Sequence, residues 1–339
     1  MPRTRSILPA TARILAGSAL ASRAMQAAIE TAAPRHGGLI DAGGLRLHVV
    51  SRGARRDGRP AMLLVHGLAG TARNFTMRLT GLLEGDHELH VVDRPGAGYS
   101  DDMGTRGTLV AQARLLVDLI GTLGLHRPLL VGHSLGGALS LQVALDHPQA
   151  IRGAALIAPA THALCPPRTA AWQRALLTPS PLGWLWTQTL AAPMAAPLSP
   201  FVTRHIFSPV RWPLAVGWQG GGYLALRPRS IAASGRDLRA ALEELPALSR
   251  RYGRLSVPVH VLGAESDALV PAAEHAARLA RESDRVRLTL VPGGHMLPIT
   301  QPHLVAAWLR DVADDVAAEV ADDAADEVAG DAADEVAGA

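Results

Sequence analysis

One stretch of ten residues constrains the fold more than any other part of the chain. Residues 129–138 are Leu-Leu-Val-Gly-His-Ser-Leu-Gly-Gly-Ala, an apolar stretch that runs into Gly-x-Ser-x-Gly and then into small residues. This pattern is typical of a buried strand followed at once by a helix. So tight a turn holds Ser134 in a strained conformation with its hydroxyl exposed. Gly132 and Gly136 fit because a side chain at either position would collide with the crossing strand and helix.

Strand and helix patterns alternate on both sides of this turn. The residues 39–41 and 45–50, joined at Gly43-Gly44, predict a hairpin at a sheet edge. Continuous apolar stretches predict further strands, at 61–65, 89–92, 154–158, 257–263 and 286–291. Helical spacing of apolar residues predicts helices at about 74–83, 109–123, 135–146, 272–281 and 302–310. The alternation predicts a mostly parallel sheet of eight strands with helices on both faces.

Two further motifs follow predicted strands and complete a recognisable set. Residues 66–70 are His-Gly-Leu-Ala-Gly, and residues 93–100 are Asp-Arg-Pro-Gly-Ala-Gly-Tyr-Ser. With the Gly-x-Ser-x-Gly turn, they stand in the order and spacing of the α/β-hydrolase superfamily. The set resembles its capped esterase and haloperoxidase-like branch. The resemblance covers about residues 38–161 and 255–310, the expected core, and implies a helical cap inserted after the sixth strand.

The resemblance implies a catalytic triad in the order serine, acid, histidine. Ser134, Asp267 and His295 fit that order, and each lies just beyond the C-terminal end of a predicted strand. A serine hydroxyl becomes a nucleophile only beside a base that an acid orients. His295 is therefore expected to take the serine proton, and Asp267 to hold the imidazole. Glu265 is the competing acid, but Asp267 matches the family's Asp-x-x-Val-Pro sequence.

Fourteen histidines compete for the role of the base. Only His295 follows the last predicted strand with two glycines before it. His66 and His133 are next to the motifs and are expected to brace their turns. His303 follows a proline at a helix start and is expected to lie on the surface.

The resemblance also implies an oxyanion hole and contacts to the substrate. The backbone N–H groups of Leu68 and Leu135 are expected to stabilise the negative charge of the reacting oxygen. Gly67 and His133 are expected to lie beside the substrate. No cofactor or metal is expected, since the sequence has no His-x-x-x-His, no paired cysteines and no phosphate-binding glycine loop.

Residues 162–254 interrupt the alternation and are expected to be the cap. Prolines are frequent there, and five of the six tryptophans fall within this segment. Most of them are expected to pack between cap helices. A minority is expected to face the substrate, and Trp184 and Trp186 are the candidates. Because the segment has only three acids, we expect an apolar pocket that selects substrates loosely.

Both ends of the chain are expected to lie outside the core. Residues 1–37 have a weak helical spacing and a faint likeness to a signal peptide. We expect an uncleaved amphipathic helix that lies against the protein or makes peripheral contact with a membrane. A cytoplasmic location is favoured, with a membrane-associated or exported protein as the alternative. Residues 311–339 contain only alanine, valine, glycine and acids, which predicts a solvated tail without a core.

Composition excludes several other classes of protein. The 339 residues are 48% hydrophobic, enough for a sizeable core, and the single cysteine, Cys165, is expected to be structural and cannot form an intramolecular disulfide. Residues 311–339 hold 11 of the 30 acids, so the rest of the chain is basic. Its arginines are scattered and not interleaved with aromatics, and nucleic acid is not an expected partner. No apolar run is long enough to span a bilayer.

Three functions remain open at this stage. The first is hydrolysis of a small-molecule carboxylic ester with an apolar acyl or alcohol part, through an acyl-enzyme intermediate. The second uses the same triad for cofactor-free perhydrolysis, as in haloperoxidase-like enzymes, or for cleavage of a carbon–carbon or amide bond. The third is a non-catalytic ligand receptor. A serine nucleophile argues against a dehalogenase or epoxide hydrolase, which need a carboxylate. The oligomeric state is not indicated.

Overall fold

The central sheet has eight strands in the order β1-β2-β4-β3-β5-β6-β7-β8. The computed structural model describes residues 7–164 and 180–337, and it describes side chains over 12–164 and 180–319. The strands are β1 (Gly38–Ala42), β2 (Leu45–Arg52), β3 (Met62–Val65), β4 (Leu89–Val92), β5 (Leu129–His133), β6 (Gly153–Ile157), β7 (Val259–Ala264) and β8 (Val286–Val291). β2 is antiparallel to both of its neighbours, and the other pairs are parallel. The predicted mostly parallel, eight-stranded α/β-hydrolase sheet is confirmed.

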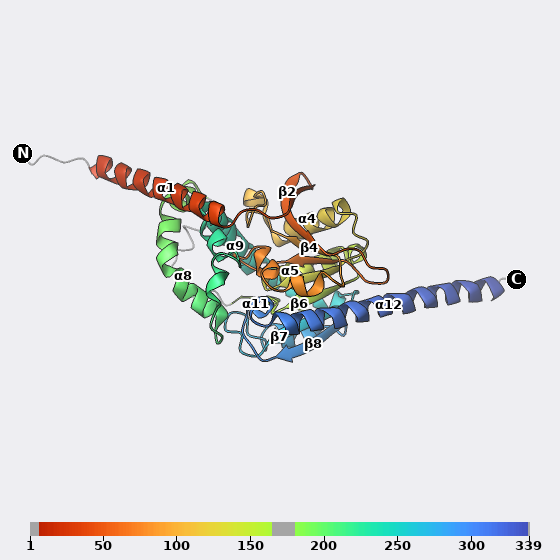
Figure 1. Cartoon of the computed structure of the whole chain (residues 1–339). Coiled ribbons are helices and arrows are strands. Elements are labelled where there is room, and N and C mark those ends of the chain that lie inside the picture. Colours follow the sequence, from red (N-terminus) through yellow and green to blue (C-terminus); the bar gives the residue numbers. More distant parts are fainter. Residues whose placement is uncertain (1–6, 165–179, 338–339) are drawn as a thin grey trace, which may run out of the picture.

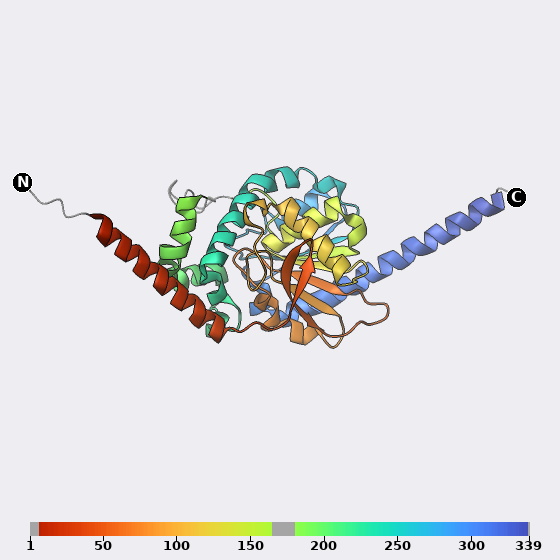
Figure 2. The same ribbon diagram turned by 90° about the horizontal axis from the view of Figure 1, so that it is seen from above.

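Helices cover both faces of this sheet (Figures 1 and 2). Alternate residues of the inner strands point to opposite faces, so that Leu63 and Val65 belong to one core cluster and Met62 and Leu64 to the other. The first cluster includes residues of α4 (Leu109–Thr122), α5 (Leu135–Asp146), α9 (Pro228–Ser249) and α10 (Ala276–Glu282). The second includes residues of α2 (Arg73–Thr76), α3 (Thr80–Leu83), α11 (Leu297–Thr300) and α12 (Pro302–Ala337). The strands are therefore buried on both sides, as continuous apolar stretches require.

Two predicted helices differ in extent from the observed ones. The helix expected at 74–83 is divided into α2 and α3, because the Leu82 amide bonds the Leu79 carbonyl three residues back and interrupts the regular pattern. The helix expected from 272 begins at Ala276. Just before it, the His275 ring accepts hydrogen bonds from the amides of Thr161 and His162.

Between β6 and β7 the chain forms an insertion of helices. Its described elements are α7 (Pro181–Trp186), the π-helical η3 (Thr187–Ala191), α8 (Ala192–Phe207), the 3₁₀ turns η4 (Leu214–Val216) and η5 (Gly222–Leu226), and α9, followed by η6 (Tyr252–Arg254). Elsewhere in the described residues, two further 3₁₀ turns are η1 (Gly104–Arg106) and η2 (Pro148–Ala150). Cys165 and Trp172 lie outside the described residues.

The N-terminal helix α1 (Ile7–Ala32) packs against this insertion (Figure 2). The Ser22 hydroxyl donates a 2.7 Å hydrogen bond to the Thr189 carbonyl, and Ile29 is buried with Leu224. Glu30 forms an ion pair of 3.0 Å with the buried Arg227. The predicted lead helix thus lies against the protein. Within residues 7–164 and 180–337, no helix has both the length and the apolar character needed to cross a membrane.

The C-terminal helix corrects one predicted boundary. The core was expected to end at residue 310, but α12 continues unbroken to Ala337 (Figure 1). Val312, Ala313 and Val316 are buried in the second core cluster, because the spacing of three and four residues places them on one face of the helix. Acids on the other side pair with the sheet, as Glu319 does with Arg287 at 2.7 Å. The first turns beyond residue 310 therefore belong to the core.

Candidate active site

Ser134 stands at the junction of β5 and α5 with a backbone that side chains rarely adopt. Its φ is 54° and its ψ is −118°, a strained conformation that persists only where surrounding structure enforces it. A Cβ at Gly132 would lie 2.5 Å from the Gly136 carbonyl oxygen, and one at Gly136 would lie 2.1 Å from the Val65 carbonyl oxygen. Strand and helix therefore approach too closely for any other residue. The Ser134 amide is fixed to the Ile157 carbonyl at 3.0 Å.

Asp267 and His295 come from loops after neighbouring strands and meet in a buried pair. The Nδ1–H of His295 donates a 2.7 Å hydrogen bond to Asp267 Oδ2. The other carboxylate oxygen accepts from the amides of Leu269 and Val270, both at 2.9 Å. Since Nδ1 carries the proton, Nε2 keeps the lone pair that a general base needs. Between the described side chains of His295 and Ser134 there is no hydrogen bond, and such bonds often tighten only when substrate is bound.

Burial and charge both distinguish Asp267 from Glu265. Glu265 is exposed, whereas Asp267 is 6% exposed and contacts His295. Burial acts to raise the pKa of Asp267, but the hydrogen bonds from His295, Val270 and Leu269 outweigh it and lower that pKa below its usual range. Asp267 is therefore a carboxylate at neutral pH, as an orienting acid must be.

Two motif histidines are held neutral and support the loops around Ser134. The His66 ring donates to the Gly67 carbonyl at 2.8 Å and accepts from the Arg94 amide at 3.0 Å. The His133 ring donates to the His295 carbonyl at 3.0 Å. Burial is the main cause that lowers the pKa of each of these histidines to about 3, and for His66 the positive charge of Arg94 adds to it. His303 is exposed.

The expected oxyanion donors lie on either side of Ser134. Leu135 is the first residue of α5, where amides have no partner within the helix. Leu68 follows Gly67, whose position is so close to the serine that a Cβ there would lie 2.8 Å from Ser134 Cβ. The loop 66–70 thus runs directly beside the nucleophile. A side chain at residue 67 would push that loop away.

A buried arginine that the sequence analysis did not single out holds this loop. The guanidinium of Arg94 is 1% exposed and donates to the carbonyls of His66 and Gly67, each at 3.0 Å. It also donates to Gln112 at 3.1 Å and pairs with Asp237 at 2.9 Å. Asp237 lies on α9 of the insertion. The guanidinium of Arg94 therefore links the loop 66–70 to the insertion. The only signal in the sequence was the position of Arg94 within the motif at 93–100.

We expect Asp237→Asn to destabilise the protein strongly. Removing one partner of a buried ion pair typically costs about 3–5 kcal/mol, since the other charge stays buried and unpaired. The exposed pair Arg46–Asp101, 2.9 Å apart, supplies the control, because Asp101→Asn should cost no more than about 1 kcal/mol. Urea unfolding of the two variants measures both values. Equal losses would contradict the structural role of Asp237.

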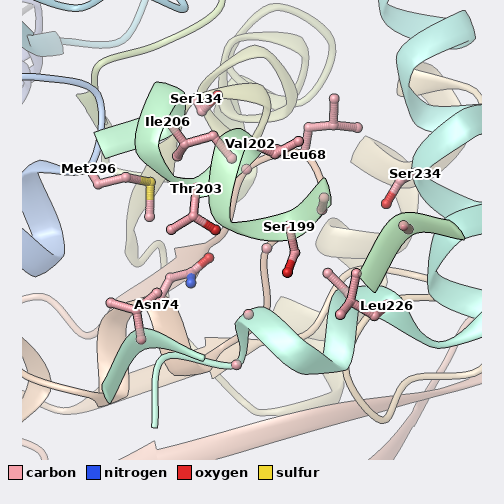
Figure 3. Close-up of a pocket in the computed structure, with 18 of the residues that line it drawn as sticks. Leu68, Asn74, Ser134, Ser199, Val202, Thr203, Ile206, Leu226, Ser234 and Met296 are labelled. Atoms are coloured by element: carbon pink, nitrogen blue, oxygen red, sulfur yellow. The ribbon is translucent and has the colours of Figure 1, made fainter. Parts of the chain in front are cut away.

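A cavity of about 470 Å³ opens above Ser134 between the core loops and the insertion. Figure 3 shows Ser134, Leu68 and Met296 of the core loops together with side chains that α8 contributes to the cavity, among them Val202 and Ile206. Gly67 and His133, which are expected to lie beside the substrate, are among its lining residues. The 24 lining residues within the described part of the chain include no Asp, Glu, Lys or Arg. Such a cavity suits an uncharged, mainly apolar ligand.

The structure does not bring Trp184 and Trp186 to this cavity. Trp184 is 65% exposed on α7, and neither tryptophan is among the lining residues. The insertion instead contributes small and aliphatic side chains. These come from α8, η4–η5 and α9, and include Leu198, Val202, Ile206, Leu226, Ile231 and Leu238. The sequence shows that these tryptophans belong to the insertion. It does not show which way their side chains point, since that depends on how the helices pack.

The buried histidines predict how stability depends on pH. His66 and His133 have pKa values of about 3 when folded and His275 of about 4, against an ordinary value of 6.5. Between these values the unfolded chain binds more protons, so stability decreases as pH falls from 6.5. Each histidine contributes at most about 1.4 kcal/mol per pH unit.

Urea unfolding at pH 7 and pH 5 tests this dependence. Carboxylates with lowered pKa values titrate mainly below this window, so the histidines dominate it. His303→Gln, at an exposed position, should leave the difference unchanged. A free energy of unfolding that is the same at both pH values would show that the buried histidines are not held neutral.

A sequence profile described as the alpha/beta hydrolase fold matches residues 60–302, more than two thirds of the chain. The chain belongs to the α/β-hydrolase family. A protein provisionally named carbamate hydrolase RutD, from Enterobacter cloacae, is 26% identical over 273 residues, covering 73% of this chain and 88% of that protein. Several other curated relatives match less: the chain spans between 31% and 43% of the length of three of them.

Solved structures share the same fold at low identity. An esterase from Thermogutta terrifontis superimposes with a TM-score of 0.65 and 21% identity, covering 83% of this chain and 99% of that one. An enol-lactonase from Burkholderia xenovorans gives a TM-score of 0.62 and 18% identity, with 81% and 98% covered. At these identities the likeness concerns the fold. Membership of the family establishes the α/β-hydrolase fold, and the reaction depends on the site.

Proposed function

We propose that this hydrolase cleaves a carboxylic ester with an apolar acyl or alcohol part, through an acyl-enzyme on Ser134. The observation that carries the proposal is the buried Asp267–His295 pair, whose histidine ring lies 4.9 Å from that of His133, next to the strained Ser134 that lines an uncharged cavity. A serine with no base or no cavity would be an ordinary turn residue. Two structural neighbours, an esterase and an enol-lactonase, agree with ester cleavage.

Each step of the reaction uses a group already described. Ser134 Oγ attacks the ester carbonyl carbon while His295 Nε2 takes its proton. The negative carbonyl oxygen is stabilised by the N–H groups of Leu68 and Leu135. His295 then gives the proton to the leaving alcohol, which departs and leaves the acyl group on the serine. Water, activated by the same histidine, releases the acid.

We further propose that residues 162–254 act as a cap that selects the substrate. The support is the lining of the cavity, most of which the insertion supplies. Because the lining has few polar groups, each methylene of the substrate should change the activation free energy by about 1–3 kcal/mol. The rate of hydrolysis should therefore vary gradually with the length of the acyl chain. A panel of p-nitrophenyl esters of increasing acyl length tests the reaction. A strong preference for a charged acyl group would contradict the proposal.

Ile206→Trp should move the preferred acyl length towards shorter esters. Ile206 faces the cavity from α8 (Figure 3), and a larger ring there would occupy space that a long acyl chain needs. We expect kcat/KM to fall about tenfold or more for long esters and far less for short ones. Trp184→Ala is the matched control, because its side chain lies outside the cavity. An equal loss for all esters would count against a role of Ile206 in selection.

A second candidate is cleavage of an amide-type C–N bond by the same residues. It is favoured by one observation, the relative named carbamate hydrolase that aligns over 73% of this chain. The two functions differ in the leaving group, which is an amine rather than an alcohol. Parallel assays with an ester, an amide and a carbamate of the same acyl size separate them.

A further inference from the structure

Exposed apolar side chains form a stripe along α8. Leu198 follows Met194 by four residues, and Phe201 and Val202 follow Leu198 by three and four, which places all four on one face of the helix. More than half of each residue is exposed, and for Phe201 the exposed fraction is 73%. Single exposed apolar residues are ordinary. A contiguous apolar stripe, in contrast, marks a surface that binds a protein, a membrane or a ligand. These four residues are called the α8 stripe below.

The α8 stripe continues into the cavity that holds Ser134. Leu198 and Val202 belong to the stripe and also line that cavity. Figure 3 shows Val202 beside Ile206, with Ser134 beyond them. An acyl chain that left an apolar phase at the stripe could thus reach the nucleophile along a continuous apolar wall. A flat apolar patch elsewhere on the protein would give no such route.

The charges around the stripe are positive. Residues 180–226 contain no aspartate and no glutamate, while Arg204 and Arg211 are exposed. Arg204 follows Phe201 by three residues on the same helix, so the cation lies next to the stripe. The neighbouring acid on α1, Glu30, is engaged by Arg227 at 3.0 Å. Apolar side chains bordered by arginine complement an anionic lipid surface, whereas two copies of this face would repel each other.

We propose that the α8 stripe binds to an anionic lipid surface. Met194 and Phe201 enter the apolar layer, and Arg204 and Arg211 meet the lipid phosphates. The cavity then opens towards the bilayer, and an ester dissolved in it reaches Ser134 without crossing water. Entry of the ester from the bilayer rests on the proposed esterase function. Binding of the α8 stripe to the lipid does not.

Sedimentation of the full chain with vesicles tests the proposal. We expect binding to vesicles of phosphatidylcholine and phosphatidylglycerol in equal parts, and much weaker binding to phosphatidylcholine alone or at high salt. The double variant M194S/F201S should bind about tenfold less or weaker still, because two apolar side chains no longer enter the lipid. Val110→Ser is the matched control, since Val110 is 54% exposed on α4 and should not matter.

Several results would overturn the proposal. They are equal binding of the double variant and the unmodified chain, equal binding to neutral and anionic vesicles, absence of binding to either, or a dimer in solution that M194S/F201S abolishes. Hydrolysis of a short soluble ester should be unchanged in that variant, which establishes that it is folded. Ser134→Ala protein should still bind vesicles, so that failure of the esterase proposal and failure of lipid binding are separate outcomes.

Discussion

Ser134→Ala is expected to reduce ester turnover by about 10⁶, which leaves a residual rate about 10³–10⁴ above the uncatalysed reaction. We expect no other described group to form the acyl intermediate in its place, because Ser134 lines the cavity and the Asp267–His295 pair is the expected source of its base. The fold should be intact. The strained backbone at φ 54° is enforced by the close crossing of β5 and α5, whether or not the hydroxyl is present.

Ser199→Ala is the matched control for this prediction. Ser199 also lines the cavity, but its hydroxyl donates to the Ala196 carbonyl at 2.8 Å and has no partner base. We expect kcat to change by less than about tenfold. Steady-state kinetics with a p-nitrophenyl ester compare the two variants, and circular dichroism checks that both are folded. A Ser134→Ala enzyme with more than a hundredth or so of normal activity would mean that another nucleophile acts.

Asp267→Asn should lower kcat by about 10⁴, the loss seen when the orienting acid of a triad becomes an amide. An asparagine in this place can present its NH₂ group to His295 and favour the wrong tautomer, with the proton on Nε2. The base would then have no lone pair for Ser134. The volume of the side chain hardly changes, so packing around the pair should be kept.

Glu265→Gln controls for charge removed from the same loop. Glu265 is exposed, and no hydrogen bond joins its described side chain to His295. Its activity should match that of the unmodified enzyme. Comparable loss in both variants would mean that the loop, and not the carboxylate of Asp267, determines the rate. Loss at Glu265 alone would show that the acid has been assigned to the wrong residue.

The parts of the site that the sequence predicts best are those set by local sterics. Gly132 is specified by a backbone contact within its own turn and Gly136 by the close approach of β3, and the apolar stretch before them forms a buried strand. Asp267 and His295 follow strands of a parallel sheet, so their loops must emerge at the edge where Ser134 lies. These residues could be found because each lies at a fixed place in a repeating pattern.

The features that sequence analysis missed depend on contacts between distant segments. Arg94 and Asp237 are brought together because α9 packs against the core, and no local sequence pattern encodes that packing. The orientation of Trp184 depends on the packing of α7, and its 65% exposure shows that it turns outward. Val312 and Val316 occur in a segment of biased composition, yet one helical face of it is apolar and meets the sheet. The amino-acid composition describes the average polarity of that segment and does not reveal the apolar face of the helix.

Labelling with a fluorophosphonate followed by mapping of the modified peptide tests the assignment of the nucleophile most directly. The reagent reacts covalently only with a serine that a neighbouring base activates. A single adduct on the peptide that contains Ser134 is expected, with no labelling of Ser134→Ala protein. An adduct on another residue, or labelling that persists in Ser134→Ala, would contradict the proposed serine hydrolase mechanism.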